Sequence, residues 1–280
     1  MLVSILSYVL AFGVAVAVVG VVRPGHPLLV IAVGDLAATV AIFAISVALD
    51  NSSVYDPYWS VKPAVIAGYY LWTLDSSVGA RQLLVAGLVF LYSIRLTTNF
   101  YRDWPGLSKE DFRYVRFRRR FPRFYWPVSF VGIHFFPTVM VYLGCLPLFG
   151  IMRDGGAPLG LLDVAGAAIM LGAILLAFVA DEQLRNFRAD SANAGKGIEH
   201  GLWKRSRHPN YLGEVCTWWG LYLFGLAAAL RWWWTGVGAV AITLMFVFVS
   251  IPMMEERAME TREGYQDYRE RTPRLLPFRR

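Results

Sequence analysis

Residues 206–230 read SRHPNYLGEVCTWWGLYLFGLAAAL, and this stretch changes from polar to apolar within a few positions. Its first nine residues contain a cation, an imidazole, an amide, a phenol and a carboxylate, and the apolar run that follows extends from Val215 to Leu230. Each charge costs roughly 2.5 to 3.5 kcal/mol inside a bilayer on insertion scales. Polar groups held at the edge of a membrane helix therefore need a reason, and the simplest reason is a bound polar ligand.

The composition indicates a membrane protein. Of the 280 residues, 56% are hydrophobic and 17% are charged, whereas about a quarter of the residues in a soluble domain are charged. Cys145 and Cys216 lie in separate apolar segments, so the sequence predicts neither a disulfide framework nor a metal site. Residues 1–22 lack a basic n-region and a small-residue cleavage site, so we expect a retained span rather than a cleaved signal.

About eight apolar segments follow one another, each judged against the roughly 20 residues that a helix needs to cross the hydrocarbon. The third is short and rich in tyrosine, so a tilted or half-inserted helix is expected there. The sequence thus predicts an all-α polytopic transmembrane helical bundle of about 7–8 spans, which forms a single integral membrane domain over residues 1–280. The segments are 2–22, 28–48, 58–74, 81–98, 126–149, 158–180, 211–229 and 231–254.

The distribution of charge predicts the orientation. Residues 95–123 are strongly basic, whereas the connection near residue 153 carries one arginine and one aspartate. Because cytoplasmic loops carry an excess of Lys and Arg, we expect residues 95–123, 181–210 and 255–280 on the cytoplasmic side, in a bacterial inner membrane. The net charge of +7 then fits contact with anionic membrane lipids better than a nucleic-acid partner.

Cationic side chains near the ends of two spans form a candidate anion site. If the helix of the sixth segment continues, Asp181, Arg185 and Arg188 lie on one of its faces. Guanidinium groups suit phosphate because their planar fork makes paired, charge-assisted hydrogen bonds. Arg207 and His208 add further cationic or titratable groups. The alternative is that these arginines only anchor the spans to lipid headgroups.

Three motifs in the second half of the chain belong together. Residues 210–214 (NYLGE) follow residues 201–203 (GLW), an Asp-x-x-x-Arg-x-x-Arg run occupies 181–188, and Tyr268 precedes Pro277-Phe278 by nine positions. These motifs resemble those of the membrane steroid 5-alpha-reductase family, in particular its bacterial uncharacterised branch. The resemblance extends from about residue 177 to residue 280.

This resemblance implies a bundle around a lipophilic pocket, with NADPH bound from the cytoplasm and its phosphates held by arginines. Residues 1–125 would supply the substrate side and residues 126–280 the cofactor side. The chain has no GxGxxG fingerprint, so a Rossmann domain is not expected. The implied cofactor-binding residues are Asp181, Arg185, Arg188, Arg207, His208, Asn210, Tyr211, Glu214 and Arg257.

In the same family a carboxylate and a tyrosine hold the ketone oxygen of the substrate. Residues 56–63 (DPYWSVKP) and 91–95 (LYSIR) resemble the two stretches concerned, which implies the catalytic residues Asp56 and Tyr92. The implied reaction is hydride transfer to the β carbon of an enone, with hydrogen bonds from Tyr92 and a protonated Asp56 to the enolate oxygen. Burial would raise the pKa of Asp56 as this role requires. A helix cap at Asp56 and a packed Tyr92 are the structural alternatives.

A second resemblance is to the isoprenylcysteine carboxyl methyltransferases, a related membrane group that binds S-adenosylmethionine. It depends on the Arg-His-Pro run at 207–209 and on Glu255 and Glu256, which would face the cationic groups of that cofactor. A transporter or a lipid-binding membrane protein without catalysis is a third alternative, but here the polar groups collect on one side rather than at the midplane. We favour the reductase because five residues match one set of cofactor-binding positions, whereas the methyltransferase likeness depends on two short runs. The five are Asp181, Arg185, Arg188, Asn210 and Glu214. The sequence does not identify its lipophilic substrate.

Overall fold

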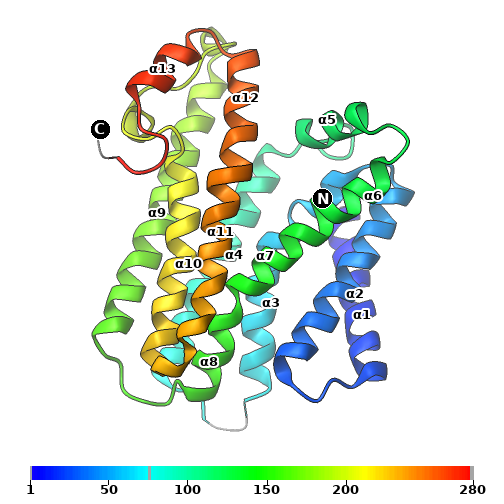
Figure 1. Cartoon of the computed structure of the whole chain (residues 1–280), viewed down its shortest axis with the longest axis vertical. Helices are drawn as coiled ribbons and strands as arrows, with labels where there is room; N and C mark the ends of the chain where they lie inside the picture. The colour runs from blue at the N-terminus through cyan, green and yellow to red at the C-terminus, as the bar shows by residue number, and fades with distance from the viewer. Residues whose placement is uncertain (1, 75–76, 278–280) are drawn as a thin grey trace.

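The computed structural model describes residues 2–74 and 77–277 and consists of helices joined by short loops (Figure 1). Within these ranges the β contacts amount to one isolated bridge between Lys196 and Glu263. The prediction of an all-α polytopic bundle is therefore confirmed.

The first half of the chain supplies one side of the molecule and the elements that cross its middle. Its long helices alternate with short connecting helices, and a π-helical segment interrupts the fifth apolar segment. The elements are α1 Leu2–Val22, α2 Pro27–Ala48, η1 Ser52–Tyr55, α3 Tyr58–Trp72, α4 Ala80–Asp103, α5 Phe112–Arg120, α6 Tyr125–Ser129, η2 Phe130–Phe135, α7 Phe136–Gly144 and α8 Leu146–Asp154.

The second half forms the tall part of the bundle, in which α9, α10 and the α11–α12 stack lie beside one another (Figure 1). A second π-helical segment, η6, separates α11 from α12. The elements are α9 Leu161–Ala189, η3 Ser191–Asn193, η4 Gly201–Lys204, α10 Pro209–Ala228, η5 Leu230–Thr235, α11 Gly236–Met245, η6 Phe246–Ser250, α12 Ile251–Thr261 and α13 Tyr265–Arg271.

Six helices or helix stacks in the described part of the chain are long and apolar enough to cross a membrane, as an integral membrane protein requires. Two of the eight expected segments differ. The third forms α3, whose 15 residues extend about 22 Å and are too short for the hydrocarbon. The seventh forms α10, which is long enough but is not among the helices that are apolar enough to cross a membrane. Many of its residues are buried against other helices, so fewer of its side chains have to be apolar for contact with lipid. The six are Leu2–Val22, Pro27–Ala48, Ala80–Asp103, Tyr125–Asp154, Leu161–Ala189 and Leu230–Thr261.

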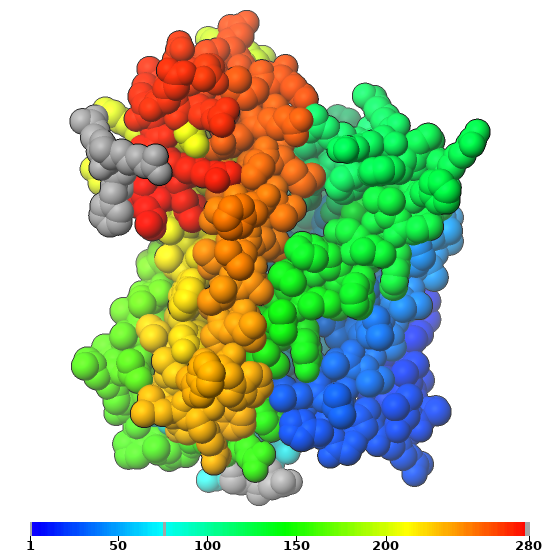
Figure 2. Space-filling model, in the orientation of Figure 1, coloured from blue at the N-terminus to red at the C-terminus, as the bar shows by residue number. Residues whose placement is uncertain are grey.

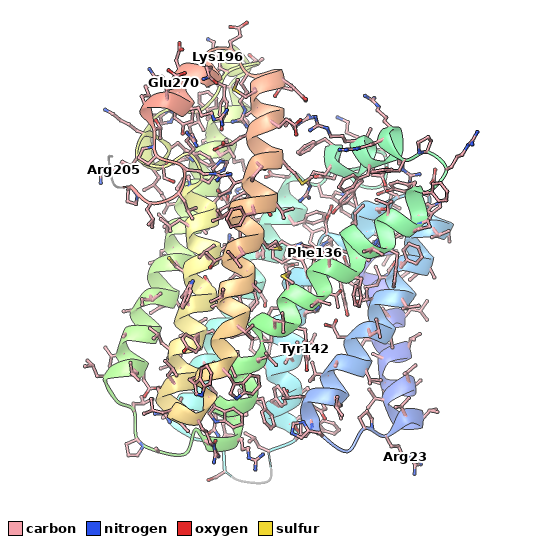
Figure 3. All side chains as sticks on the ribbon, viewed as in Figure 1. Arg23, Phe136, Tyr142, Lys196, Arg205 and Glu270 are labelled. Atoms are coloured by element: carbon pink, nitrogen blue, oxygen red, sulfur yellow. The ribbon has the colours of Figure 1, made fainter. Side chains whose placement is uncertain are left out.

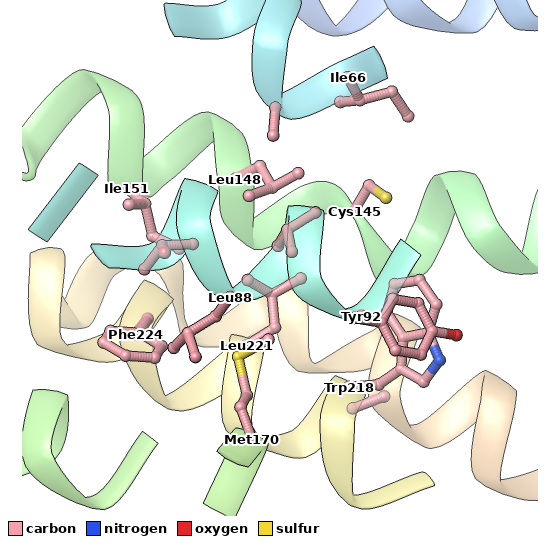
Figure 4. Close-up of a cluster of buried hydrophobic side chains, with 14 of the residues drawn as sticks. Ile66, Leu88, Tyr92, Cys145, Leu148, Ile151, Met170, Trp218, Leu221 and Phe224 are labelled. Carbon is pink, nitrogen blue, oxygen red and sulfur yellow. The ribbon is translucent and has the colours of Figure 1, made fainter. Parts of the chain in front are cut away.

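The main core lies between α3, α4, α8, α9, α10 and α11. Leu88, Leu148, Met170 and Phe224 are buried within it, and Tyr92 lies beside Trp218 at one end (Figure 4). The two rings pack edge to face with their centroids 5.8 Å apart. This end of the core adjoins the polar residues that the sequence analysis singled out.

The polar ends of the bundle separate as the charge distribution predicts. Lys196, Arg205 and Glu270 lie at one end of the molecule, and Arg23 lies at the other (Figure 3). The basic helix α5, the end of α9 and helix α13 share the first end (Figure 1). The segments expected on one membrane face are therefore on one side of the bundle.

Candidate functional site

Close packing of α9 against α10 brings two of the predicted residues together. A Cβ atom at Gly213 would lie 2.6 Å from the carbonyl oxygen of Ala173, so only glycine permits this approach of the two helices. One turn before Gly213, the Asn210 side-chain amide donates to Asp181 Oδ1 over 3.0 Å. Helix α9 continues past Asp181 to Ala189, which meets the condition for Asp181, Arg185 and Arg188 to share one face.

Arg95 joins the carboxylates of α9 and α10. Its guanidinium contacts Asp181 Oδ2 at 3.2 Å and also donates to Glu214, and both carboxylates are largely buried. The hydroxyl of Tyr92 donates to the other oxygen of Glu214 over 2.8 Å. A continuous polar chain thus runs from Tyr92 through Glu214, Arg95 and Asp181 to Asn210.

Asp181, Asn210 and Glu214 of this polar chain line a cavity of about 330 Å³, which lies within the size range of small-molecule sites. Tyr92 and Arg95 are not among the residues that line it, and Tyr92 is packed against Trp218 as the structural alternative expected. Apolar side chains such as Trp218, Ile242 and Phe246 form most of its wall. Figure 2 shows the molecule hollowed between α12 and the α5–α6 segment, whose residues contribute to this wall. The polar residues that line the cavity are Tyr55, Asp56, Asn99, Arg113, Tyr114, Asp181, Asn210, Tyr211, Glu214 and Ser250.

Asp56 reaches the cavity from the connection between η1 and α3. Its side chain is 11% exposed, accepts a hydrogen bond from the Tyr114 hydroxyl and lies 3.8 Å from the Arg113 guanidinium. Burial raises the pKa of Asp56 to about 7, and Arg113 opposes this shift. Its side chain makes no cap of α3, so the structural alternative of a helix cap is not what the geometry shows.

Arg185 and Arg188 have different surroundings. Arg185 donates to Asp103 Oδ1 over 3.0 Å and to the Asn99 side chain, so it meets the cavity only through Asn99. Arg188 is exposed and forms no ion pair within the described residues, and it lies close enough to Arg262 for their charges to repel. The two arginines therefore do not converge on one point of the cavity wall.

Arg207 and His208 bind the C-terminal segment and α12 rather than the cavity. Arg207 donates to Glu255 Oε1 over 2.9 Å and to the carbonyl oxygen of Thr272 over 3.1 Å. His208 Nε2 lies 3.1 Å from the same oxygen of Glu255, and burial lowers the pKa of His208. The imidazole stacks on Tyr211, with centroids 5.4 Å apart and an interplanar angle of 11°. His208 thus orients a tyrosine that does line the cavity.

Glu256 and Arg257 both lie on the exposed side of α12. Glu256 forms an ion pair of 2.9 Å with Arg116, and Arg257 lies over the Phe112 ring at 4.2 Å. Neither Glu255 nor Glu256 is among the residues that line the cavity. Arg262 lies five residues after Arg257 at the end of α12, and its partial burial and the nearby Arg257 lower its pKa.

Two interrupted helices face each other across the cavity. Gly132 and Ile133 belong to η2, and Phe246, Val249 and Ser250 belong to η6. Such π-helical interruptions are frequent at functional sites because the extra residue re-aims nearby side chains. Below them α7 and α11 pack so closely that a Cβ at Gly238 would lie 2.0 Å from the carbonyl oxygen of Leu143.

Sequence reasoning missed Arg95, Arg113, Tyr114 and Arg262 as site residues. Arg95 had a usable signal, because it is a charged residue one helical turn after Tyr92 in an apolar span. Arg113 and Tyr114 had none, since they belong to a basic loop whose charges the positive-inside rule already explains. No group of three or more potential metal ligands is present among residues 2–74 and 77–277. The Phe278 part of the C-terminal motif lies outside the described residues.

Comparison with known proteins relates the chain to a family. The model of the family described as "Protein of unknown function (DUF1295)" matches residues 42–272, which include the whole candidate site. The chain is also 30% identical over 267 residues to the uncharacterized protein C594.04c of Schizosaccharomyces pombe, covering 84% of this chain and 75% of the yeast protein. No solved structure matches the chain. The protein therefore belongs to the DUF1295 family.

Proposed function

We propose that this protein is a membrane-embedded reductase that uses NADPH to reduce the C=C bond of a lipophilic enone. The observation that carries the proposal is the convergence of Asp56, Asp181, Asn210, Tyr211 and Glu214 on one largely apolar cavity. These residues come from three separate regions of the sequence, and the likeness to membrane steroid 5-alpha-reductases assigns Asp56 to catalysis and the other four to cofactor binding. The bundle would lie in a bacterial inner membrane with the cofactor side toward the cytoplasm.

The wall of the cavity suits a flat apolar substrate. Trp218 is buried and offers a broad ring surface, and Ile242, Met245 and Met254 provide aliphatic and thioether contacts. Thioether side chains adapt to irregular apolar shapes. A conjugated ring ketone of the 3-oxo-Δ4-steroid type has the matching chemistry, with one polar oxygen on an apolar body.

The phosphates of NADPH would lie outside the cavity, which is too small for a whole dinucleotide. Arg188, Arg257 and Arg262 have no carboxylate partner within the described residues, and all three occur at the polar ends of α9 and α12. Their mutual repulsion would be relieved by a bound phosphate. Asp181 and Asn210 would then hold the carboxamide or ribose groups nearer the reacting carbon.

Bound NADPH would supply the hydride that adds to the β carbon of the enone. Negative charge then develops on the ketone oxygen, where a protonated Asp56 donates a hydrogen bond. Tyr114 already donates to Asp56 Oδ1, which leaves Oδ2 to carry the proton. Tyr92 does not line the cavity, so its hydroxyl would hold Glu214 in position rather than contact the substrate, and the α carbon would take its proton from water.

One observation favours a second candidate function. The cavity wall contains the three carboxyl groups of Asp56, Asp181 and Glu214 but only one cationic side chain, Arg113. An acidic wall suits the sulfonium of S-adenosylmethionine, as in a methyltransferase of the isoprenylcysteine carboxyl type. The acidic wall suits the positively charged ring of oxidised nicotinamide equally well. The arginines outside the cavity that have no carboxylate partner within the described residues favour a dinucleotide over S-adenosylmethionine.

Thermal unfolding of the purified protein separates the two functions. A ligand at about a hundred times its Kd stabilises the folded state by about 2.7 kcal/mol, so NADPH should raise the Tm and S-adenosylmethionine should not. Replacement of Asn210 by Ala should abolish the NADPH effect. Replacement of the exposed Asn186 of the neighbouring helix should preserve it. Loss of NADPH absorbance with progesterone as the enone then tests the reaction itself.

Either of two results would overturn the reductase. A rise in Tm with S-adenosylmethionine and none with NADPH would assign the site to methyl transfer. No rise with either cofactor, together with no NADPH consumption, would remove both enzymatic functions.

A further inference from the structure

A second cavity lies between α1, α2 and α3, apart from the candidate active site. It has a volume of about 560 Å³, and we call it the α1–α3 groove. Phe12, Val16 and Trp72 line it and are exposed at the surface of the bundle, so its open side faces lipid. Its wall is apolar except for two charged side chains and three tyrosines, which are Asp35, Lys62, Tyr8, Tyr58 and Tyr69.

The two charged side chains form an ion pair within the membrane-spanning region. Lys62 Nζ lies 2.6 Å from Asp35 Oδ2, and both side chains are less than a tenth exposed. Burial of such a pair costs several kcal/mol of desolvation for each ion, and well-packed apolar residues are often equally stable. Neither residue lines the candidate active site. Intramembrane charges commonly mark a binding site, and the proposed reduction does not use this pair.

The pair has hydrogen-bonding capacity that the protein does not use. The ammonium group of Lys62 has three N–H donors, and its described partners are Asp35 and the carbonyl oxygen of Thr138, at 3.1 Å. Asp35 Oδ1 accepts one hydrogen bond of 2.9 Å from Tyr58 and can accept another. One donor and one acceptor beside each other match a hydroxyl group, and the Lys62 donor alone also matches a carbonyl oxygen. The pair has no net charge, so it does not favour an ionised headgroup.

The depth of the pair also restricts the ligand. Asp35 lies eight residues after the first residue of α2 and thirteen before the last, or about 12 Å and 20 Å along the helix axis. The headgroup of a phospholipid lies at the interface rather than at this depth. A lipid whose polar oxygen reaches Asp35 and Lys62 must therefore lack an ionised headgroup.

We propose that the α1–α3 groove binds a neutral lipid whose hydroxyl or carbonyl oxygen is held by the Lys62–Asp35 pair. The apolar chain of the lipid lies along Phe12, Val16 and Val65. This site is separate from the proposed reduction and does not depend on it.

Photoaffinity labelling tests the site in the intact purified protein. A hexadecanol that carries a diazirine in its chain should label peptides of α1 and α3, and excess hexadecanol should suppress this labelling. Hexadecyl phosphate should suppress the labelling only at a concentration at least tenfold higher than that of hexadecanol, because its charged headgroup remains at the interface. The double variant Asp35→Leu/Lys62→Met removes both charges together and should reduce labelling at least tenfold.

A second variant keeps the test valid if the double variant does not fold. Val65→Trp fills the groove while Asp35 and Lys62 are retained, and it should also reduce labelling at least tenfold. Val164→Trp makes the same change on the lipid-facing side of α9 and should leave labelling unchanged. Equal labelling of α9 and α1, equal competition by the phosphate, or protection of the groove by a second copy of the chain would each overturn the proposal.

Discussion

Two buried carboxyl groups of the candidate active site differ in how their charge is compensated. Glu214 receives the Arg95 guanidinium and the Tyr92 hydroxyl directly. Asp56 has the neutral Tyr114 hydroxyl as its direct partner, and its nearest cation, Arg113, is 3.8 Å away and closer to Asp111. Asp56 is therefore the group suited to remain neutral near pH 7 and to donate a proton or a hydrogen bond.

The pH dependence of the reaction should reveal Asp56. With a pKa of about 7, the carboxyl group is neutral and able to donate below this pH and is ionised above it, so the rate should fall as the pH rises through 7. Asp56→Asn retains a donor that cannot ionise, so this fall should disappear. Asp56→Ala should lower kcat by roughly 10²- to 10³-fold below pH 7 and by less above it, where the carboxyl group of the unmodified protein is already ionised. An unchanged pH profile in Asp56→Asn would exclude this role.

The same shift affects stability. A carboxyl group whose pKa is raised in the folded state favours folding below its unfolded value of 3.8, and this contribution is lost as the pH rises through about 7. Asp56→Asn should therefore raise the Tm at pH 8 and change it little at pH 4. Thermal unfolding at the two pH values measures the difference.

Arg188 should distinguish NADPH from NADH. It is an exposed guanidinium without an ion pair in the described part of the chain, so it is available for the 2′-phosphate that only NADPH carries. Loss of a charged hydrogen bond of about 1.5 to 3 kcal/mol in Arg188→Ala should raise the Kd of NADPH at least tenfold and leave NADH unaffected. The exposed Arg119 of α5 provides a matched control, since its replacement should change neither Kd. Equal losses for both cofactors would remove the assignment.

At the scale of elements, the α9–α10 contact controls the geometry of the site. Gly213 allows α10 to approach the backbone of α9, and this approach holds Asn210 beside Asp181. Gly220 repeats the contact two turns later against Met170 and the carbonyl oxygen of Gly166. Small residues at such positions are typical of membrane helix interfaces, where van der Waals packing rather than water exclusion drives association.

Glycine-to-alanine replacements should have opposite effects at two positions of this helix pair. Alanine is favoured over glycine in helices by about 1 kcal/mol, so Gly172→Ala, with nothing within 4 Å of the added Cβ, should maintain or raise the Tm. Gly213→Ala meets backbone atoms of α9 and should destabilise the protein by about 1 to 3 kcal/mol and weaken cofactor binding. Thermal unfolding of both variants checks this, and equal Tm values would show that the contact is not tight.

At the scale of the whole molecule, the two ends of the bundle differ in their content of basic residues. The basic residues of α5, the end of α9 and the C-terminal segment share one end, and the loop after α8 lies at the other (Figure 1). This arrangement satisfies the excess of Lys and Arg expected of cytoplasmic connections. If that end faces the cytoplasm, as we propose, the candidate phosphate-binding arginines are within reach of a cytoplasmic cofactor.

Cysteine accessibility tests this orientation in intact cells. In a variant that lacks Cys145 and Cys216, an added cysteine at Gly156 should react with a membrane-impermeant maleimide. Cysteines at Ser108 and Ala192, which are also exposed, should react only after permeabilisation. The reverse pattern would place the candidate site on the outer face.

Much of the fold and part of the site follow from the sequence alone. Apolar length, separating prolines and glycines, and the bias of Arg and Lys determine that this chain is a helical membrane protein with its polar chemistry at one end. Asp181, Asn210 and Glu214 could be predicted because their motifs are local, within one helical turn or two of a span boundary. Such signals extend over a few residues because helix periodicity and hydropathy are short-range properties.

Tertiary structure alone decided which of the predicted residues face the cavity. Glu214 meets Tyr92 from 122 positions away, and Asp56 meets Tyr114 across 58. Arg207 carries the same guanidinium as Arg95, yet it binds Glu255 and the C-terminal segment, whereas Arg95 joins two carboxylates of the site. The partner of a long charged side chain depends on which helices pack together and at what separation. That packing is set by contacts such as Gly213 against α9, which no local pattern around an arginine contains.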